Sequence, residues 1–491
     1  MRGRVFPTAL FFGVDFRIAY YPAFPTQPVD SMSRFPLPFR FVILFLISVC
    51  FGPSSLVQAQ SPPALDLRLF DIANASSAER IEKDIRTLVG FGTRHTLSDT
   101  ISATRGIGAA RRWIKSTFDT ISTTCGGCLE VKYQRTLVKG GEGSRIPRDT
   151  WIVNVLAVLR GTQFPDRYVI MSGDIDSRVS SALNDSSDSP GANDNASGMA
   201  GVIEAARLLS EYSFSTSILF TGLSGEEQGL FGGKAMAEMA LEEEWDIVGV
   251  LNNDMIGNIS GVDGRIDNAA FRIFSEPTPV TEDDRTRQRR RFTGGEVDGP
   301  SRQLARFVER TTRLIMPEMN PMLIYRLDRF GRGGHHRPFN DAGFAGIRIM
   351  EAHENYTRQH QDIRVENGIS YGDVIEGVNF DYAASLTAVN AINLASMAWA
   401  PPSPSNVGIG GAVRPSTTLA WDEVVDPNLA GYIVYWRDTT EPQWTRSKFV
   451  GDVTGYTLEG VVIDNYLFGV AAVGRDGNQS VISFPTGSIR R

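Results

Sequence analysis

The chain has 491 residues, of which 42% are hydrophobic and 21% are charged, so its composition is that of a folded globular protein and excludes a disordered or fibrous one. This length allows one large α/β domain and a smaller second domain. The formal net charge of −7 argues against a nucleic-acid partner, because a phosphate-binding surface normally carries a basic excess.

Residues 1–59 have the pattern of an export signal. An apolar run over residues 39–51 follows two arginines and precedes a small-x-small cleavage pattern at residues 57–59. The run is shorter than the ~20 residues of a membrane-spanning helix, which favours a cleaved signal peptide over an anchor. The residues before Met32 match no part of such a signal, which favours a start at Met32. We therefore expect a secreted protein, either extracellular or periplasmic.

Two cysteines lie beyond the predicted signal peptide. Cys125 and Cys128 form a Cys-Gly-Gly-Cys turn before a strand that we expect to begin at Leu129. In an oxidising compartment they can close a small disulfide loop. A redox role is the alternative, but no thioredoxin-like βαβ pattern surrounds the pair, which favours a structural disulfide.

Alternating patterns of helix and strand predict a large α/β domain over residues 60–399. Helical spacing of apolar residues predicts helices at residues 78–89, 103–118, 196–209, 229–241 and 382–398. Apolar runs predict strands at residues 152–159, 168–171, 217–223, 247–252 and 347–350. This order is typical of a mostly parallel sheet flanked by helices.

Acidic side chains follow several of these predicted strands. They are Asp176, Asp194, Glu226, Glu227 and Asp254, and His360 follows later in the chain. Loops at the carboxyl ends of parallel strands meet at one edge of the sheet, where such folds place their sites. Carboxylates gathered there repel one another unless cations lie between them, so the sequence predicts a metal centre.

The four segments 172–178, 190–198, 224–232 and 252–257, with His360, resemble the M28 family of co-catalytic zinc peptidases. The resemblance covers about residues 88–398. It implies two metal ions bridged by one carboxylate, a second carboxylate and a histidine on one ion, and a glutamate as general base. Carried over by position, it makes Asp194 the bridge, Glu227 and His360 the ligands that complete one zinc site, Asp254 a ligand of the other, Glu226 the base and Asp176 a carboxylate beneath the metals.

One position departs from the pattern of the family. The first segment usually reads His-x-Asp with the histidine as a ligand, and this chain has Asp174 there. The second site would then consist of Asp174, Asp194 and Asp254, whose oxygens suit Mg²⁺, Mn²⁺ or Ca²⁺ better than an imidazole-containing site does. We therefore expect one or two bound ions, with zinc preferred only at the first site.

Other candidate residues have weaker support. His336 either lies behind the metal site or caps the helix that starts near Pro338, and Tyr356 is a candidate for polarising the scissile carbonyl. We assign no role to His335. His95 and His353 are expected to be structural or exposed.

Two further segments complete the organisation. A basic run at residues 285–291 follows three acidic residues, and we interpret it as a solvated, mixed-charge loop. A proline-rich linker at residues 400–406 precedes short alternating strands over residues 407–491, which resemble a fibronectin type III domain of the β-sandwich type. An extra sheet of the main domain is the alternative for this tail.

These features predict a secreted metal-dependent exopeptidase, with an aminopeptidase favoured. The alternatives are a carboxypeptidase or glutaminyl-cyclase-like enzyme on the same scaffold, or a binding ectodomain without catalysis. The adjacent Glu226 and Glu227 argue against a binding ectodomain. Two neighbouring carboxylates repel each other and cost stability, and a protein without catalysis has no need of them. We expect peptide substrates, no nucleic acid, and a surface, polymer or protein partner for the C-terminal domain.

Overall fold

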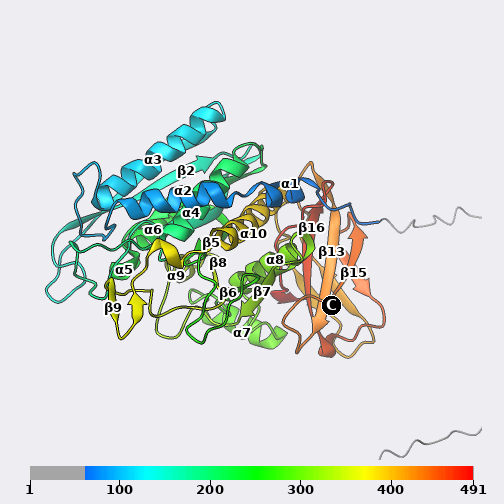
Figure 1. Ribbon diagram of the computed structural model, residues 1–491. Helices are drawn as coiled ribbons and strands as arrows, with labels where there is room; N and C mark the ends of the chain where they lie inside the picture. The colour runs from blue at the N-terminus through cyan, green and yellow to red at the C-terminus, as the bar shows by residue number, and fades with distance from the viewer. Residues whose placement is uncertain (1–60, 490–491) are drawn as a thin grey trace, which may run out of the picture. The chain divides into compact units, whose positions relative to one another are not determined.

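The computed structural model describes residues 61–489 (Figure 1). The predicted signal peptide and the start at Met32 lie outside these residues. Among the helices that are described, none has both the length and the apolarity that crossing a bilayer requires.

An eight-stranded mixed sheet organises the larger part of the chain (Figure 1). Its order is β1-β2-β4-β3-β5-β8-β6-β7. The four central strands β4, β3, β5 and β8 are parallel, while β1, β2 and the β6-β7 pair run antiparallel to the strands they join. The strands are β1 (Leu129–Val138), β2 (Thr150–Leu159), β3 (Phe164–Asp174), β4 (Thr216–Leu223), β5 (Asp246–Asn253), β6 (Ala270–Ser275), β7 (Asn320–Ile324) and β8 (Gly346–Glu351).

Helices cover both faces of this sheet because successive residues of its central strands are apolar, so that each face has its own apolar side chains. On β2, Val155 and Ala157 face one core, and Leu156 and Val158 face the other. The first core packs against α1, α2, α3, α4, α8 and α10, and the second against α6 and α9. The helices are α1 (Arg68–Ala75), α2 (Ala78–Gly90), α3 (Gly106–Thr124), α4 (Ala196–Leu209), α5 (Glu226–Gly229), α6 (Phe231–Glu242), α7 (Asp284–Thr293), α8 (Pro300–Ile315), α9 (His336–Asp341) and α10 (Phe380–Trp399).

The α/β class and the sheet flanked by helices are confirmed, with antiparallel strands added at its edges. The prediction of a loop over residues 285–291 is wrong, because this run forms the exposed helix α7. Asp283 accepts the N–H of Thr286 at the start of α7, and Gly294 ends it with φ 76°. These caps close a helix whose side chains all remain unburied, so its charges are solvated as expected.

Two smaller sheets follow α10. One contains β15-β12-β11-β17 and the other β14-β13-β16, and their shared core includes Trp421, Tyr432 and Phe468. Arg437 on β13 donates to both carboxylate oxygens of Asp298 at 2.9 Å. The strands are β11 (Gly408–Gly410), β12 (Thr417–Ala420), β13 (Leu429–Asp438), β14 (Arg446–Gly451), β15 (Gly455–Leu458), β16 (Tyr466–Gly474) and β17 (Gly487–Ser488).

The expected disulfide is present. Cys125 and Cys128 are bonded, with their Cα atoms 5.6 Å apart. The bond closes the turn between α3 and β1, so it ties the end of a core helix to the edge of the sheet.

Candidate metal centre

Asp194, Glu227 and His360 bring their side chains together beyond the carboxyl ends of the parallel strands. Asp194 precedes α4, Glu227 lies in α5, and His360 follows β8. His360 Nε2 lies 3.0 Å from Asp194 Oδ2 and 2.9 Å from Glu227 Oε1. Within residues 61–489, this triad is the one group of three metal-ligating side chains whose ligand atoms all lie within 4.8 Å of one another.

The charges of the triad are strongly coupled. Burial lowers the pKa of His360, but Glu227 and Asp194 outweigh burial and raise it to about 9. Burial raises the pKa of Asp194 and of Glu227, but His360 outweighs it and holds both below their usual range. The two carboxylates therefore attract positive charge, which a divalent cation supplies in place of the imidazole proton. Two carboxylates and one imidazole fit the donor set of a catalytic zinc site, which keeps its fourth position open.

Arg178 orients two members of the triad. Its Nε lies 2.7 Å from Glu227 Oε2, and its Nη2 lies 2.6 Å from His360 Nδ1. These contacts hold the outer atoms of both side chains. Glu227 Oε1 and His360 Nε2 are therefore left as the atoms that face each other and Asp194.

Asp373 fixes the loop that carries Asp194. It accepts the backbone N–H of Asn193 at 2.9 Å and that of Asp194 at 2.6 Å. Gln359, next to His360 in the chain, donates its side-chain N–H to Asp194 Oδ2 at 3.1 Å. The peptide bond from Asp194 to Asn195 is cis. Asp373 was not among the predicted site residues, because it lies in a loop without any motif.

Asp176 holds the helix α5 in place. Its carboxylate accepts the backbone N–H groups of Glu226 and Glu227 at 3.2 and 3.1 Å, and the hydroxyl of Thr96 at 3.0 Å. Gly225, with φ 75°, lets the chain turn from β4 into this helix. Asp176 thus contacts the backbone of both glutamates, and its role beneath a metal centre stays a prediction.

Glu226 lines a cavity of about 260 Å³ together with the triad. Burial and the neighbouring carboxylates, first Glu227 and then Asp254, raise the pKa of Glu226 well above its usual range. A carboxyl group with a raised pKa beside a metal site is suited to taking up and releasing a proton.

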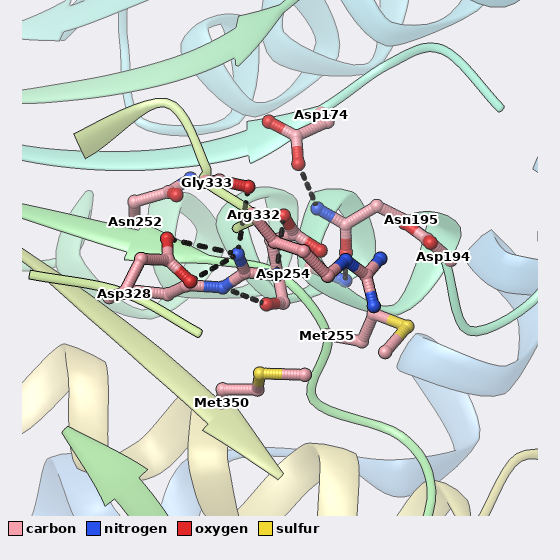
Figure 2. Close-up of polar contacts among 12 residues, drawn as sticks. Asp174, Asp194, Asn195, Asn252, Asp254, Met255, Asp328, Arg332, Gly333 and Met350 are labelled. Atoms are coloured by element: carbon pink, nitrogen blue, oxygen red, sulfur yellow. Dashed lines mark hydrogen bonds and ion pairs between the residues drawn. The ribbon is translucent and has the colours of Figure 1, made fainter. Parts of the chain in front are cut away.

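Asp174 has its oxygens engaged by two other side chains. Asn195 donates to Asp174 Oδ2 at 2.7 Å, and His335 Nδ1 lies 2.6 Å from Asp174 Oδ1 (Figure 2 shows the first bond). His335 is fully buried. The histidine to which we assigned no role therefore contacts the aspartate that replaces the usual histidine of the family.

Asp254 pairs with a buried arginine. Arg348 Nη2 lies 2.7 Å from Asp254 Oδ2, and Arg348 Nη1 lies 3.2 Å from both oxygens of Asp328. Figure 2 labels the two aspartates, with dashed lines marking their contacts. Arg348 also donates to the backbone oxygen of Asp254 and to that of Gly333. Burial and the carboxylates of Asp174 and Asp194 raise the pKa of Asp254 to about 7 despite the arginine. All three residues of the site predicted from Asp174, Asp194 and Asp254 thus contact other side chains of the protein.

The remaining candidates lie outside the triad. His336 begins α9 and is fully buried, with Nε2 2.9 Å from the backbone oxygen of Leu327. Tyr356 is 56% exposed and is not part of the cavity lining. His95 is buried, with Nε2 3.0 Å from the backbone oxygen of Ala182, so it has the structural environment we expected.

Comparisons with known proteins agree with the geometry. A family model described as Peptidase family M28 matches residues 154–264. A "Probable zinc metalloprotease" of Pyrenophora tritici-repentis (strain Pt-1C-BFP) is 39% identical over 430 residues, which cover 87% of this chain and 99% of that protein. Another, of Phaeosphaeria nodorum (strain SN15 / ATCC MYA-4574 / FGSC 10173), is 38% identical over 442 residues, covering 87% of this chain and 89% of that protein.

The fold also matches solved structures. The crystal structure of LapA from Legionella pneumophila superposes with a TM-score of 0.50 at 16% sequence identity, covering 70% of this chain and 80% of that one. At this identity the match supports the fold alone. The family model and the relatives above show that the chain belongs to peptidase family M28.

Proposed function

We propose that the chain is a secreted aminopeptidase that depends on zinc held by Asp194, Glu227 and His360. The observation that carries the proposal is the approach of these three ligand atoms within 4.8 Å of one another, beside a cavity that Glu226 also lines. Its membership of a peptidase family and the names of its relatives support zinc and peptide substrates.

The contacts of the site favour one tightly bound ion over two. A second ion at Asp174, Asp194 and Asp254 would compete with His335 for Asp174 and with Arg348 for Asp254. The guanidinium of Arg348 is fully buried and already supplies positive charge to that half of the site. The second site would therefore bind any divalent ion more weakly than the triad binds zinc.

The residues of the chain have distinct parts in hydrolysis. A bound zinc ion supplies Lewis acidity, which polarises a carbonyl group and acidifies water. Glu226 accepts a proton at its carboxylate and passes it to the departing amine. Asp176 keeps Glu226 and Glu227 in position through their backbone N–H groups, and Arg178 orients Glu227 and His360.

The size and charge of the cavity support cleavage at a chain end. Its volume of about 260 Å³ is below the ~300–1,000 Å³ of typical ligand sites, so it suits a terminal residue better than an extended segment. The carboxylates of Glu226 and Asp254, which line it, could receive a free α-amine. The arginines of the same cavity favour a second candidate, a carboxypeptidase that binds a terminal carboxylate.

Secretion and the identity of the C-terminal domain belong to the same proposal. The predicted signal peptide and the Cys125–Cys128 disulfide both suit an oxidising compartment. Seven short strands in two sheets after α10 are compatible with a fibronectin type III-like sandwich over residues 407–491. Such a domain would attach the enzyme to a surface, a polymer or a protein.

The proposal is tested with a panel of aminoacyl 4-nitroanilides and N-blocked peptides, each with and without a chelator. We expect hydrolysis of the free-amine substrates that chelation abolishes and zinc restores. Glu226→Gln should lower kcat roughly 10²- to 10⁴-fold while zinc content stays at one ion. Glu238→Gln, an exposed position on α6, is the matched control.

The other outcomes separate the alternatives. Turnover of N-blocked peptides alone would identify a carboxypeptidase, and cyclisation of N-terminal glutamine would identify a glutaminyl-cyclase-like enzyme. Zinc binding without turnover of any substrate would leave a binding ectodomain. Full activity of Glu226→Gln would show that another group is the base.

A further inference from the structure

Arginines dominate the wall of the cavity beside the triad. Five arginines and four carboxylates line it, and a zinc ion at the triad adds two positive charges. The loaded cavity therefore carries a positive excess and attracts anions. The arginines are Arg145, Arg178, Arg329, Arg332 and Arg337.

Three of these arginines have carboxylate partners within the protein. Arg178 pairs with Glu227 at 2.7 Å, while Arg329 and Arg332 pair with Glu354 at 2.9 and 3.3 Å. These contacts hold the three guanidinium groups in the wall of the cavity, although Arg329 and Arg332 share Glu354 with Arg272.

Arg145 and Arg337 differ from the other three. In the part of the chain that the structure describes, neither forms an ion pair. Arg145 lies between β1 and β2 and donates only to the backbone oxygen of Glu227, at 2.8 Å. The Nε of Arg337 is buried and has no hydrogen-bond partner. A buried donor without an acceptor is unfavourable, so an acceptor from a bound molecule would improve the site.

The glycine-rich loop before α9 makes room for Arg337. A Cβ added at Gly333 would lie 2.6 Å from Arg337 Cδ and 2.8 Å from its Nη1. Any larger residue at position 333 would therefore push the guanidinium out of its present place. The chain thus keeps an unpaired arginine at the cavity beside the proposed metal site.

We propose that Arg337, assisted by Arg145, binds a carboxylate of the peptide substrate and makes the enzyme selective for it. The inference rests on the peptidase function proposed above. The carboxylate belongs either to an aspartate or glutamate side chain at the N-terminal residue or to the free C-terminus of a short peptide. Planar guanidinium groups bind carboxylates through paired hydrogen bonds, which a neutral amide cannot match.

The test uses substrate pairs that differ in charge and little in shape. Glutamyl and glutaminyl 4-nitroanilide test the side chain, and leucyl-leucine and its C-terminal amide, which both keep a free N-terminus, test the terminal carboxylate. We expect kcat/KM for the acid to exceed that for the amide roughly 10- to 100-fold in one of the two pairs. Arg337→Gln should bring that ratio close to one, and Arg337→Lys should restore part of it.

Two further variants sharpen the result. Gly333→Ala, which displaces the arginine without removing it, should lower the same ratio. Arg265→Gln replaces an exposed arginine whose side chain is 73% accessible, and it should leave the ratio as in the wild type. Calorimetric binding of glutamate and glutamine, and of leucyl-leucine and its amide, to the zinc-loaded Glu226→Gln protein gives a readout that needs no turnover.

The outcomes distinguish this inference from the proposed function. Efficient, metal-dependent hydrolysis with no preference for either acid would overturn the inference and leave the peptidase intact. A preference that survives Arg337→Gln and Arg145→Gln together would also overturn it. If no substrate is cleaved, tighter binding of glutamate than glutamine, or of leucyl-leucine than its amide, lost in Arg337→Gln, would support the site, and equal binding within both pairs would refute it.

Discussion

Replacing Arg348 with methionine should strongly destabilise the protein. Arg348 is fully buried and bridges Asp254 and Asp328, whose side chains are only 4% and 2% accessible. Methionine fills much of the space but leaves buried Asp254 without its arginine, and Asp328 with only Arg329, whose Nε lies 3.5 Å away. Removing one partner of a buried ion pair costs about 3–5 kcal/mol of unfolding free energy, because the remaining charge is uncompensated. The melting temperature should therefore fall by about 3–6 °C.

The measurement is thermal and urea unfolding of the chelator-treated protein, so that metal binding does not mask the change. Arg265→Met is the matched control, since Arg265 also has an aspartate partner but is 73% accessible, and we expect a change below about 0.5 kcal/mol. Arg348→Met/Asp328→Asn should recover part of the loss, because one buried charge is removed with its partner. If Arg348→Met is as stable as Arg265→Met, the buried ion pair does not stabilise the site as we argue.

Three further predictions follow from contacts around and away from the site. Asp373→Ala should weaken zinc binding roughly 10- to 100-fold in a chelator competition, because Asp373 positions the loop of Asp194; unchanged affinity would exclude this role. Replacing Cys125 and Cys128 with serine should lower the free energy of unfolding in urea by about 2 kcal/mol, since the disulfide closes a very short loop. A larger loss would mean that the folded chain without the disulfide is strained. Burial raises the pKa of Glu276 to about 7, so its contribution to stability is present at low pH and is lost as pH rises through 7. Glu276→Gln should therefore gain melting temperature relative to the wild type between pH 5 and pH 8, and a constant difference would contradict the shift.

The triad could be predicted because its members lie in short motifs that follow buried strands or precede a helix. Glu227 comes shortly after β4 and Asp194 comes directly before α4. The carboxyl ends of parallel strands meet at one edge whatever the strand order. Only His360 depended on resemblance alone, since no strand immediately precedes it. The α/β class could also be predicted, because helical and strand patterns alternate along the sequence.

The partners of the second half of the site could not be predicted. His335 contacts Asp174 across 161 residues, Arg348 contacts Asp254 across 94, and Asp373 contacts Asp194 across 179. Such pairs depend on which strands and loops become neighbours, and periodicity within one segment carries no such information. Arg348 did offer a signal, because a charged residue inside an apolar strand must find a buried counter-charge.

Helix α7 was missed for a different reason. Its sequence has no apolar stripe, so the pattern of a packed helix is absent. Asp283 and Gly294 nevertheless occupy the two capping positions, and these local signals were sufficient to identify its ends. The capping residues therefore predict an exposed helix even where no apolar stripe is present.

The most direct test of the metal centre is the zinc content of the purified protein and of His360→Ala, measured by mass spectrometry after dialysis against a weak chelator. The triad predicts one zinc ion per chain in the wild type and almost none in His360→Ala, while circular dichroism shows that the variant remains folded. Two zinc ions retained with equal affinity, or wild-type zinc content in His360→Ala, would contradict it.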